Sequence, residues 1–554
     1  MQSLIREVAY GTMARRDRRS RHLAAARHYE VIGEDELAGA LASHYVAAHQ
    51  ASDAGDESDA IAVQARLALG AAAGRAASLG SHDQAIAYLE QALDITTDAA
   101  DRAPLLDRAA ISAVAAARED APRYGQTAVE AYREVGDRVA VATATARLGR
   151  VFLDASELDR AREVLEPAVT DAEALDDKSP LAAILANLAR VYMRRADMDR
   201  SIAAADRALA LAERLNLEPV IAEALENKAS ALNMAGRRRE SSALHAKALE
   251  LAQKIGERSL ELRIWNNYAS GTADDDPVAS ARMLVESAAL ARDLGDRGIY
   301  YFQLTQVAAA HLEMGRDWDE YLVAMKDAYE TSALRNDRIR LRIFIGLMEA
   351  ARGERLDAFH REIEELADGQ AGVEARFALS MVRAEVELRR GAHDAAYQRA
   401  IEACDLLYQD PSIAAEVALR AAMRGQNPDG IRRAAGLVAE LQRSGLMTEV
   451  RRQQARAALA ASDGRTDAAV ADFTAVQVRL ASLEQAYLAA LMAIDAVALL
   501  PDAAPLRELA ERSRPLLEDL RASADIADLD RALASGRPST AARSAAEIPS
   551  TTAG

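Results

Sequence analysis

Residues 181–220 read LAAILANLARVYMRRADMDRSIAAADRALALAERLNLEPV, and they are one unit of a stretch, Val139 to Ala333, that repeats every forty residues. A fixed interval of this size is typical of a solenoid, in which units stack because none can bury its apolar face alone. Three columns of residues keep the interval: Ala168, Ala208, Ala248, Ala288 and Ala328; Gly149, Ala189, Ala229, Ala269 and Ala309; and Asn187, Asn227 and Asn267.

Within one unit the spacing is that of two helices joined by a turn. Leu188, Ala189 and Tyr192 stand in the first helix, and Ala205 and Ala208 stand in the second. Small residues let the two helices approach closely, and large residues fill the space beside them. This pattern resembles the tetratricopeptide repeat (TPR), whose unit of about 34 residues is shorter. Long units of this kind resemble those of kinesin light chain and of bacterial signalling ATPases. We therefore expect an all-α fold, a TPR-like α-α superhelical solenoid of helical hairpins of about 40 residues.

Composition and charge narrow the possible functions. The chain has 554 residues and a net charge of −18, which argues against a general nucleic-acid binder, because phosphate contacts need a basic face. Its one cysteine, Cys404, excludes an internal disulfide and fits a reducing cytoplasm. No stretch resembles a signal peptide or is long and apolar enough to span a bilayer. We expect a cytoplasmic protein without a membrane partner.

The first fifty residues do not fit the repeat. Residues 4–19, LIREVAYGTMARRDRR, resemble the junction at which the nucleotide-binding domain of bacterial AAA/STAND signalling ATPases passes into TPRs. We expect three parts: an N-terminal helical segment over residues 1–52, a TPR-like solenoid over residues 60–534, and a disordered tail over residues 535–554. The tail is expected because its composition turns to Ser, Thr, Pro and Ala.

This resemblance implies the C-terminal, repeat-bearing sensor or regulatory part of a larger signalling architecture. Many such proteins begin with a class III adenylate or guanylate cyclase domain, and others are transcriptional regulators. The chain has no Gly-x-x-x-x-Gly-Lys-Ser/Thr loop to hold phosphates and no cyclase region. We therefore expect a non-catalytic protein without a cofactor, with any ATPase or cyclase domain encoded upstream. The alternatives are a cyclase or ATP-binding role inherited from full-length relatives, and a TPR-bearing transcriptional regulator.

The candidate partner-binding residues form two columns at the forty-residue interval. In TPR families, asparagines at the position of Asn187, Asn227 and Asn267 often face the concave groove and pair with the backbone of an extended peptide. An amide offers both a donor and an acceptor for that purpose. The alternatives are that these asparagines tie neighbouring helices together or reflect recent duplication.

Arg150 and Arg190 form the second column, and guanidinium groups in a groove would hold a carboxylate of the bound partner. Salt bridges between units are the alternative, since Asp and Glu are abundant. Together the two columns predict that a peptide or protein binds in the concave groove.

Other candidates favour structural roles. The basic run from Arg15 to Arg21 is interrupted by Asp17 and is interpreted as a solvated face or an interface to the ATPase domain. His82 and His393 fit turns and not metal ligands. Cys404 fits a small core position, and Asp274 to Asp276, before Pro277, predict the start of a helix.

Overall fold

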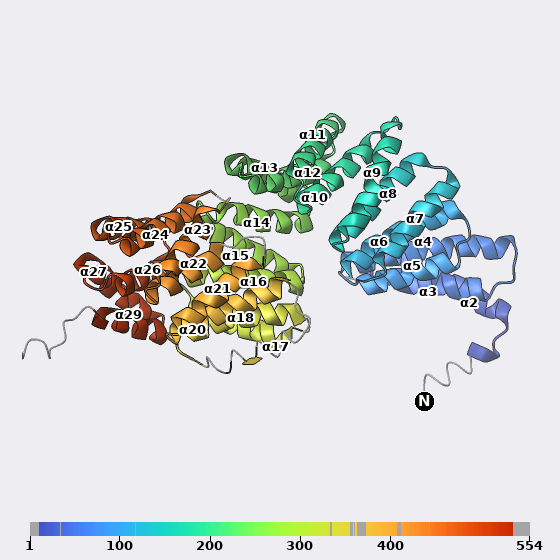
Figure 1. Ribbon diagram of the computed structural model, residues 1–554. Helices are drawn as coiled ribbons and strands as arrows, with labels where there is room; N and C mark the ends of the chain where they lie inside the picture. Colours follow the sequence, from blue (N-terminus) through green and yellow to red (C-terminus); the bar gives the residue numbers. More distant parts are fainter. Residues whose placement is uncertain are drawn as a thin grey trace, which may run out of the picture. The chain divides into compact units, whose positions relative to one another are not determined.

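The protein is built from helices throughout its described residues, in which no strand is present (Figure 1). The computed structural model describes residues 10–33, 35–116, 118–332, 335–354, 358, 361–362, 373–406, 412–441 and 444–535. The all-α fold of stacked helical hairpins is thereby confirmed. The chain divides into two compact units, Met1–Ile255 and Gly256–Gly554, and each is described by itself. Most of the predicted tail, residues 536–554, lies outside the described residues, as do residues 1–9.

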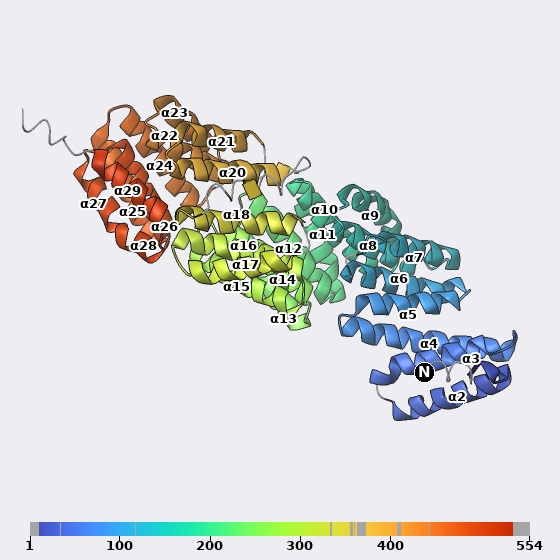
Figure 2. The same cartoon turned by 90° about the horizontal axis from the view of Figure 1, so that it is seen from below.

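The N-terminal unit is a stack of helical hairpins (Figure 2). The first two helices form a hairpin that packs on α4 and shares its apolar core, so the predicted boundary near residue 52 stays a prediction. The helices of this unit are α2 (Arg15–Ile32), α3 (Ala38–Gln50), α4 (Asp56–Ser78), α5 (His82–Asp94), α6 (Ala99–Ala115), α7 (Ala121–Val135), α8 (Arg138–Asp154), α9 (Leu158–Glu173), α10 (Ser179–Arg194), α11 (Met198–Leu215), α12 (Glu218–Met234) and α13 (Arg238–Ile255).

Turns between the two helices of a hairpin recur at the forty-residue interval. Ser156, Ala196 and Gly236 occupy the same turn position with φ values of 63°, 60° and 79°. The backbone N–H of the following residue reaches back to a carbonyl five residues earlier, at 2.8–2.9 Å, and so satisfies the helix end. The left-handed conformation costs a non-glycine residue roughly 1–2 kcal/mol. Only in the third turn does glycine avoid that cost.

The small-residue column lets the helices of a hairpin touch, as the sequence predicted. A Cβ atom added at Gly149 on α8 would lie 2.5 Å from the fully buried side chain of Leu165 on α9. Ala189, Ala229 and Ala269 occupy the same position in later units and are fully buried. Larger residues there would force the paired helices apart.

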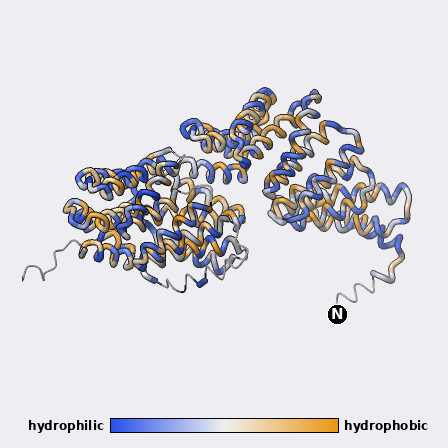
Figure 3. Tube along the Cα trace, viewed as in Figure 1, coloured by the Kyte–Doolittle hydropathy of each residue, from blue (hydrophilic) through white to orange (hydrophobic). Residues whose placement is uncertain are grey.

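The first helix of each hairpin lies on the inner side of the stack. Helices α8, α10 and α12 pack directly on one another, whereas the second helices α9, α11 and α13 have no comparable contacts with each other. Neighbouring elements are closest on the inside of a curve, so the first helices α6, α8, α10 and α12 carry the inner face of this unit. Helix α4 continues this row of first helices, because Arg108 on α6 donates to the carbonyl of Gly70 on α4. Apolar and polar residues alternate at short intervals along many of the helices in Figure 3, as expected for amphipathic helices.

The C-terminal unit repeats the hairpin architecture and then folds back on itself. The helices are α14 (Arg258–Thr272), α15 (Pro277–Asp293), α16 (Arg297–Met314), α17 (Trp318–Thr331), α18 (Arg335–Ala351), α20 (Val373–Arg389), α21 (His393–Asp405), α22 (Ser412–Arg424), α23 (Pro428–Ala439), α24 (Leu446–Ser462), α25 (Thr466–Ser482), α26 (Ala486–Leu499), α27 (Ala504–Arg512), α28 (Arg514–Asp519) and α29 (Ser523–Ser535). Helix α26 is apolar on almost every side and packs against α16, α22, α24 and α29. A helix that is apolar all round must be buried, and α26 is the central helix of this unit.

The loop between α14 and α15 closes the unit by capping a distant helix. Asp276 starts α15 as predicted, because its carboxylate accepts from the N–H of Ala279 at 2.8 Å. Asp274 instead accepts from the N–H and the hydroxyl of Thr448, at 3.1 and 2.9 Å, at the beginning of α24. A carboxylate at a helix N-terminus satisfies free N–H groups and favours the helix dipole. The prediction of a single helix start was therefore incomplete.

Among the described residues, no helix combines the length and the apolar composition needed to cross a membrane.

Candidate functional site: the inner face of the N-terminal unit and a buried ion-pair network

Two of the three column asparagines are buried between neighbouring first helices. The Nδ2 of Asn187 on α10 donates to the carbonyl of Ala146 on α8 at 2.9 Å. The Nδ2 of Asn227 on α12 donates to the carbonyl of Ala186 on α10 at the same distance. Their side chains are 7% and 2% exposed. The expectation that they face a groove is wrong at these two positions, because the column points toward the preceding helix.

The third asparagine of the column, Asn267, belongs to the other unit. It lies on α14 in the C-terminal unit, is partly buried, and its Oδ1 accepts from the amide of Asn266 at 3.1 Å. The Oδ1 of Asn266 accepts in turn from Gln303 on α16 at 2.9 Å. Asn266 thereby links α14 to the following first helix, α16. Contact between any of the three asparagines and a partner stays a prediction.

Arg150 and Arg190 lie side by side on the inner face and share one carboxylate. Arg150 pairs with Asp154 at 3.1 Å and with Glu223 on α12, and Arg190 pairs with Asp154 at 2.9 Å. Burial lowers the pKa of the Arg150 guanidinium, but the carboxylates of Glu223 and Asp154 outweigh it and raise that pKa. Arg150 and Arg190 thus form salt bridges between hairpins, which is the alternative given for them above. Binding of a partner's carboxylate by these arginines stays a prediction.

The buried asparagines make a testable prediction about stability. Replacing Asn187 or Asn227 by alanine removes the donor to a buried carbonyl. Each change should lower the free energy of unfolding by about 1–3 kcal/mol, measured by urea denaturation with circular dichroism. Asn233→Ala, at a partly exposed position near the end of α12, is the matched control and should change it by less than about 0.5 kcal/mol. Equal effects at all three positions would contradict the tie.

The inner face also carries exposed apolar side chains. Asp98 is the N-cap residue of α6, and Asp137 is the N-cap residue of α8. Ile111 lies as many residues after Asp98 as Arg150 lies after Asp137, so Ile111 and Arg150 occupy equivalent positions on this face. Ile111 is 55% exposed, and Leu67 on the neighbouring α4 is 59% exposed. A surface with large apolar residues beside arginines can bind an amphipathic helix or an extended peptide of a partner.

Arg108 links the two helices that carry these apolar residues, α6 and α4. Its guanidinium lies on α4 against Gly70 and Gly74, where added Cβ atoms would come within 3.2 and 3.4 Å of it. Nη2 donates to the carbonyl of Gly70 at 2.6 Å. Glycine inside a helix costs about 1 kcal/mol relative to alanine, and here it makes room for the arginine. This part of the inner face was not identified from the sequence.

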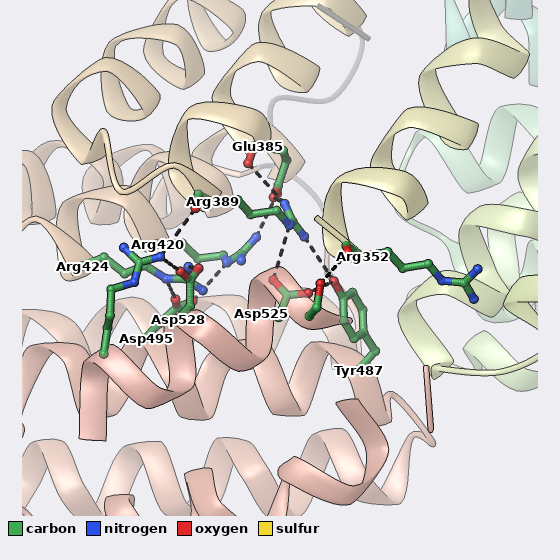
Figure 4. Close-up of polar contacts among 11 residues, drawn as sticks. Arg352, Glu385, Arg389, Arg420, Arg424, Tyr487, Asp495, Asp525 and Asp528 are labelled. Atoms are coloured by element: carbon green, nitrogen blue, oxygen red, sulfur yellow. Dashed lines mark hydrogen bonds and ion pairs between the residues drawn. The ribbon is translucent and has the colours of Figure 1, made fainter. Parts of the chain in front are cut away.

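A second feature missed by the sequence analysis is a network of buried charges in the C-terminal unit (Figure 4). Asp495 on α26 is fully buried and accepts from Arg420 at 3.0 Å and from Arg424, both on α22. Arg420 also donates to Glu385 on α20 at 2.8 Å. Burial raises the pKa of Glu385, but the arginines around it outweigh burial and lower it to about 2.

The network continues into the last described helix. Tyr487 on α26 donates to Asp525 on α29 at 2.7 Å, and Arg389 on α20 approaches the same carboxylate at 3.3 Å. Asp528, one turn further along α29, pairs with Arg424. Four helices far apart in the sequence are thus joined by charge pairs inside the unit (Figure 4).

The remaining candidates have structural surroundings. Arg15 donates to the carbonyls of Gln50 and Ser52 at 3.2 Å, and Arg19 pairs with Glu57 at 3.0 Å, so the basic run helps to fix α2 to the next helices. Cys404 is buried as predicted, and burial raises the pKa of its thiol to about 11. Across the described ranges, no group of three or more His, Cys, Asp or Glu side chains could hold a metal ion.

Comparison with known proteins finds likenesses among solved structures. No family model matches it, and no curated protein matches it. The fold is a helical-repeat solenoid. BtubC (BKLC) from P. vanneervenii is similar at 20% identity over 43% of this chain and 92% of its own, with a TM-score of 0.31.

Two further solved structures are similar at lower identity. A signal transduction ATPase with numerous domains (STAND) and a tetratricopeptide repeat sensor, from Pyrococcus horikoshii, is 15% identical over 63% of this chain and 54% of its own, with a TM-score of 0.40. A Rap protein complexed with competence and sporulation factor is 14% identical over 63% of this chain and 97% of its own, with a TM-score of 0.41. These likenesses concern the arrangement of helical hairpins alone.

Proposed function

We propose that the protein is a non-catalytic scaffold that binds a peptide or partner protein on the inner face of its N-terminal unit. The observation that carries this proposal is the exposure of Leu67 and Ile111 on successive first helices, beside Arg108 and the paired Arg150 and Arg190. Apolar anchors beside guanidinium groups favour a partner that presents apolar and acidic residues together.

The biological setting is part of the same proposal. The resemblance of residues 4–19 to a STAND-type junction supports a sensor or regulatory part of a bacterial signalling ATPase or cyclase-type protein, working in the cytoplasm. If the chain were instead an enzyme with an inherited cyclase or ATPase activity, the purified protein would turn over ATP or GTP. A transcriptional regulator would bind DNA.

Selection of binding peptides tests the proposed face directly. A phage-displayed random peptide library is selected on the immobilised full chain, and the affinities of enriched peptides are measured by fluorescence anisotropy. We expect enriched peptides to combine apolar and acidic residues. The variant Leu67→Asp/Ile111→Asp should bind them at least ten times more weakly, because it puts carboxylates where apolar anchors dock.

The control is Leu79→Asp, a change at an equally exposed leucine just beyond the end of α4. It should leave the affinity of the peptides unchanged. Peptides that bind the inner-face variant and the unmodified chain equally well, or a selection that enriches none, would overturn the proposed face.

A further inference from the structure

Two histidines meet inside the first hairpin of the N-terminal unit. His22 lies on α2 and His44 lies on α3, and both residues are partly buried. Their Nδ1 atoms are 2.9 Å apart, which is a hydrogen-bond distance. Such a bond needs one Nδ1 that carries a hydrogen and one that accepts it, so it cannot form when both imidazoles are protonated. His22 and His44 are called the histidine pair below.

The groups around the histidine pair do not compensate a second charge. The hydroxyl of Tyr10, before α2, lies 2.9 Å from Nε2 of His22, and the guanidinium of Arg18 lies over the Tyr10 ring. The ring of Tyr29 on α2 stacks on that of His44, with 5.5 Å between the centroids. Among the described residues, no carboxylate forms a hydrogen bond or an ion pair with either imidazole. Two protonated imidazoles would therefore repel each other without a paired carboxylate there.

Helix α2 depends on polar contacts because it buries little apolar surface. Ala26 is the one buried residue along its length, and α3 is the one described helix that packs substantially against it. Its other attachments are polar: Arg19 pairs with Glu57 at 3.0 Å, and Tyr45 on α3 donates to Glu30 at 2.6 Å. Histidine is the side chain whose charge ordinarily changes between about pH 5 and 8. The histidine pair is therefore the attachment of α2 that responds to pH in this interval.

Protonation of the histidine pair opposes the packing of α2 on α3. Burial lowers the pKa of His22, and the charge of His44 lowers that pKa further. When α2 leaves α3, His22 returns to water and to its ordinary pKa of 6.5. Because the folded pKa is below this value, the contribution of His22 to packing is fully present above about pH 6.5 and is lost as pH falls through the folded pKa.

We propose that the histidine pair is a pH-sensitive switch, which keeps α2 packed on α3 at neutral pH and releases it under mildly acidic conditions. Once released, α2 has lost its packing partner, and a single helix of this length is only marginally stable in water. The later hairpins keep their own contacts, so the response is confined to the first helix. The switch is separate from the inner face proposed above, whose residues begin on α4.

Hydrogen exchange of the full chain, followed by mass spectrometry, tests the switch. Protection factors, which correct for the effect of pH on the intrinsic exchange rate, are measured at pH 7.5 and pH 5. Peptides from α2 report the release, and peptides from α10 are the internal reference. Between the two pH values, the protection of α2 should fall about tenfold more than that of α10, because release takes up protons that the packed helix excludes.

Two variants identify the groups responsible. In His44→Gln, the amide oxygen can accept from Nδ1 of a protonated His22, so the additional fall in the protection of α2 should disappear. His28→Gln is the matched control, since His28 is an exposed histidine on the same helix, and it should keep the fall. His22→Gln removes the other imidazole and should behave like His44→Gln.

Two results would overturn the proposal. One is an equal change in the protection of α2 and α10 in the unmodified chain. The other is the same additional fall for α2 in His44→Gln as in the unmodified chain. If neither pair variant folds, the unmodified chain decides by itself, because the first result needs no substitution.

Discussion

Replacing Asp495 by alanine should lower the free energy of unfolding of the C-terminal unit by about 3–5 kcal/mol. Asp495 is fully buried, and its two oxygens accept from Arg420 and Arg424. Without it, two guanidinium groups stay in the interior with less compensating charge, and such a loss costs far more than the pair itself contributes. Both tryptophans of the chain, Trp265 and Trp318, belong to this unit, so tryptophan fluorescence during urea denaturation reports its unfolding.

The control for this change is Asp502→Ala, at an exposed position just beyond α26. It should change the unfolding free energy by less than about 0.5 kcal/mol. Asp495→Asn keeps the shape and loses the charge, and we expect an intermediate effect. A loss below about 1 kcal/mol for Asp495→Ala would contradict the role of the network as a structural tie.

The second large effect concerns pH and Glu313 on α16. Burial raises the pKa of this carboxyl to about 7; the positive charge of Arg451 opposes the increase and Glu416 adds to it. Because the folded pKa is above the unfolded value, the contribution of Glu313 to stability is fully present below about pH 4.5 and is lost as pH rises through about 7. Above that pH, the folded protein must hold a partly buried carboxylate.

Glu313→Gln should therefore stabilise the C-terminal unit at pH 8, by up to about 3 kcal/mol, and have little effect at pH 4.5. Urea denaturation followed by tryptophan fluorescence at pH 4.5, 6 and 8 measures the difference between variant and unmodified chain. Glu320→Gln, at an exposed position on α17, is the control and should change the unfolding free energy by less than about 0.5 kcal/mol. A difference for Glu313→Gln that is the same at all three pH values would show that the carboxyl titrates normally.

The hairpins were predictable because their information is local. The spacing of small and large residues within forty positions indicated the helices, and Gly149 and Ala189 indicated which faces touch. The direction of the asparagine column was not predictable in the same way. A small rotation of a helix about its axis moves a side chain from the groove to the neighbouring helix, and the repeat interval is the same in both cases.

The buried network could not be found from the sequence because its partners are distant. Arg424 meets Asp495 and Asp528, which follow it by 71 and 104 residues. Four arginines at the ends of first helices recur at intervals near 36 residues, namely Arg316, Arg352, Arg389 and Arg424. The interval alone does not indicate which acidic residues pair with them. The division after Ile255 was also not predicted, since the forty-residue pattern continues across that position.

The contact between Asp274 and Thr448 has a consequence for the synthesis of the protein. The two residues are 174 positions apart, and the carboxylate emerges from the ribosome long before the helix that it caps. At a synthesis rate of about 5–20 residues per second, the interval is roughly 10–35 seconds. During that time the first hairpin of the C-terminal unit is without its late partner, so this contact cannot close until α24 has been translated, about two thirds of the way through the unit.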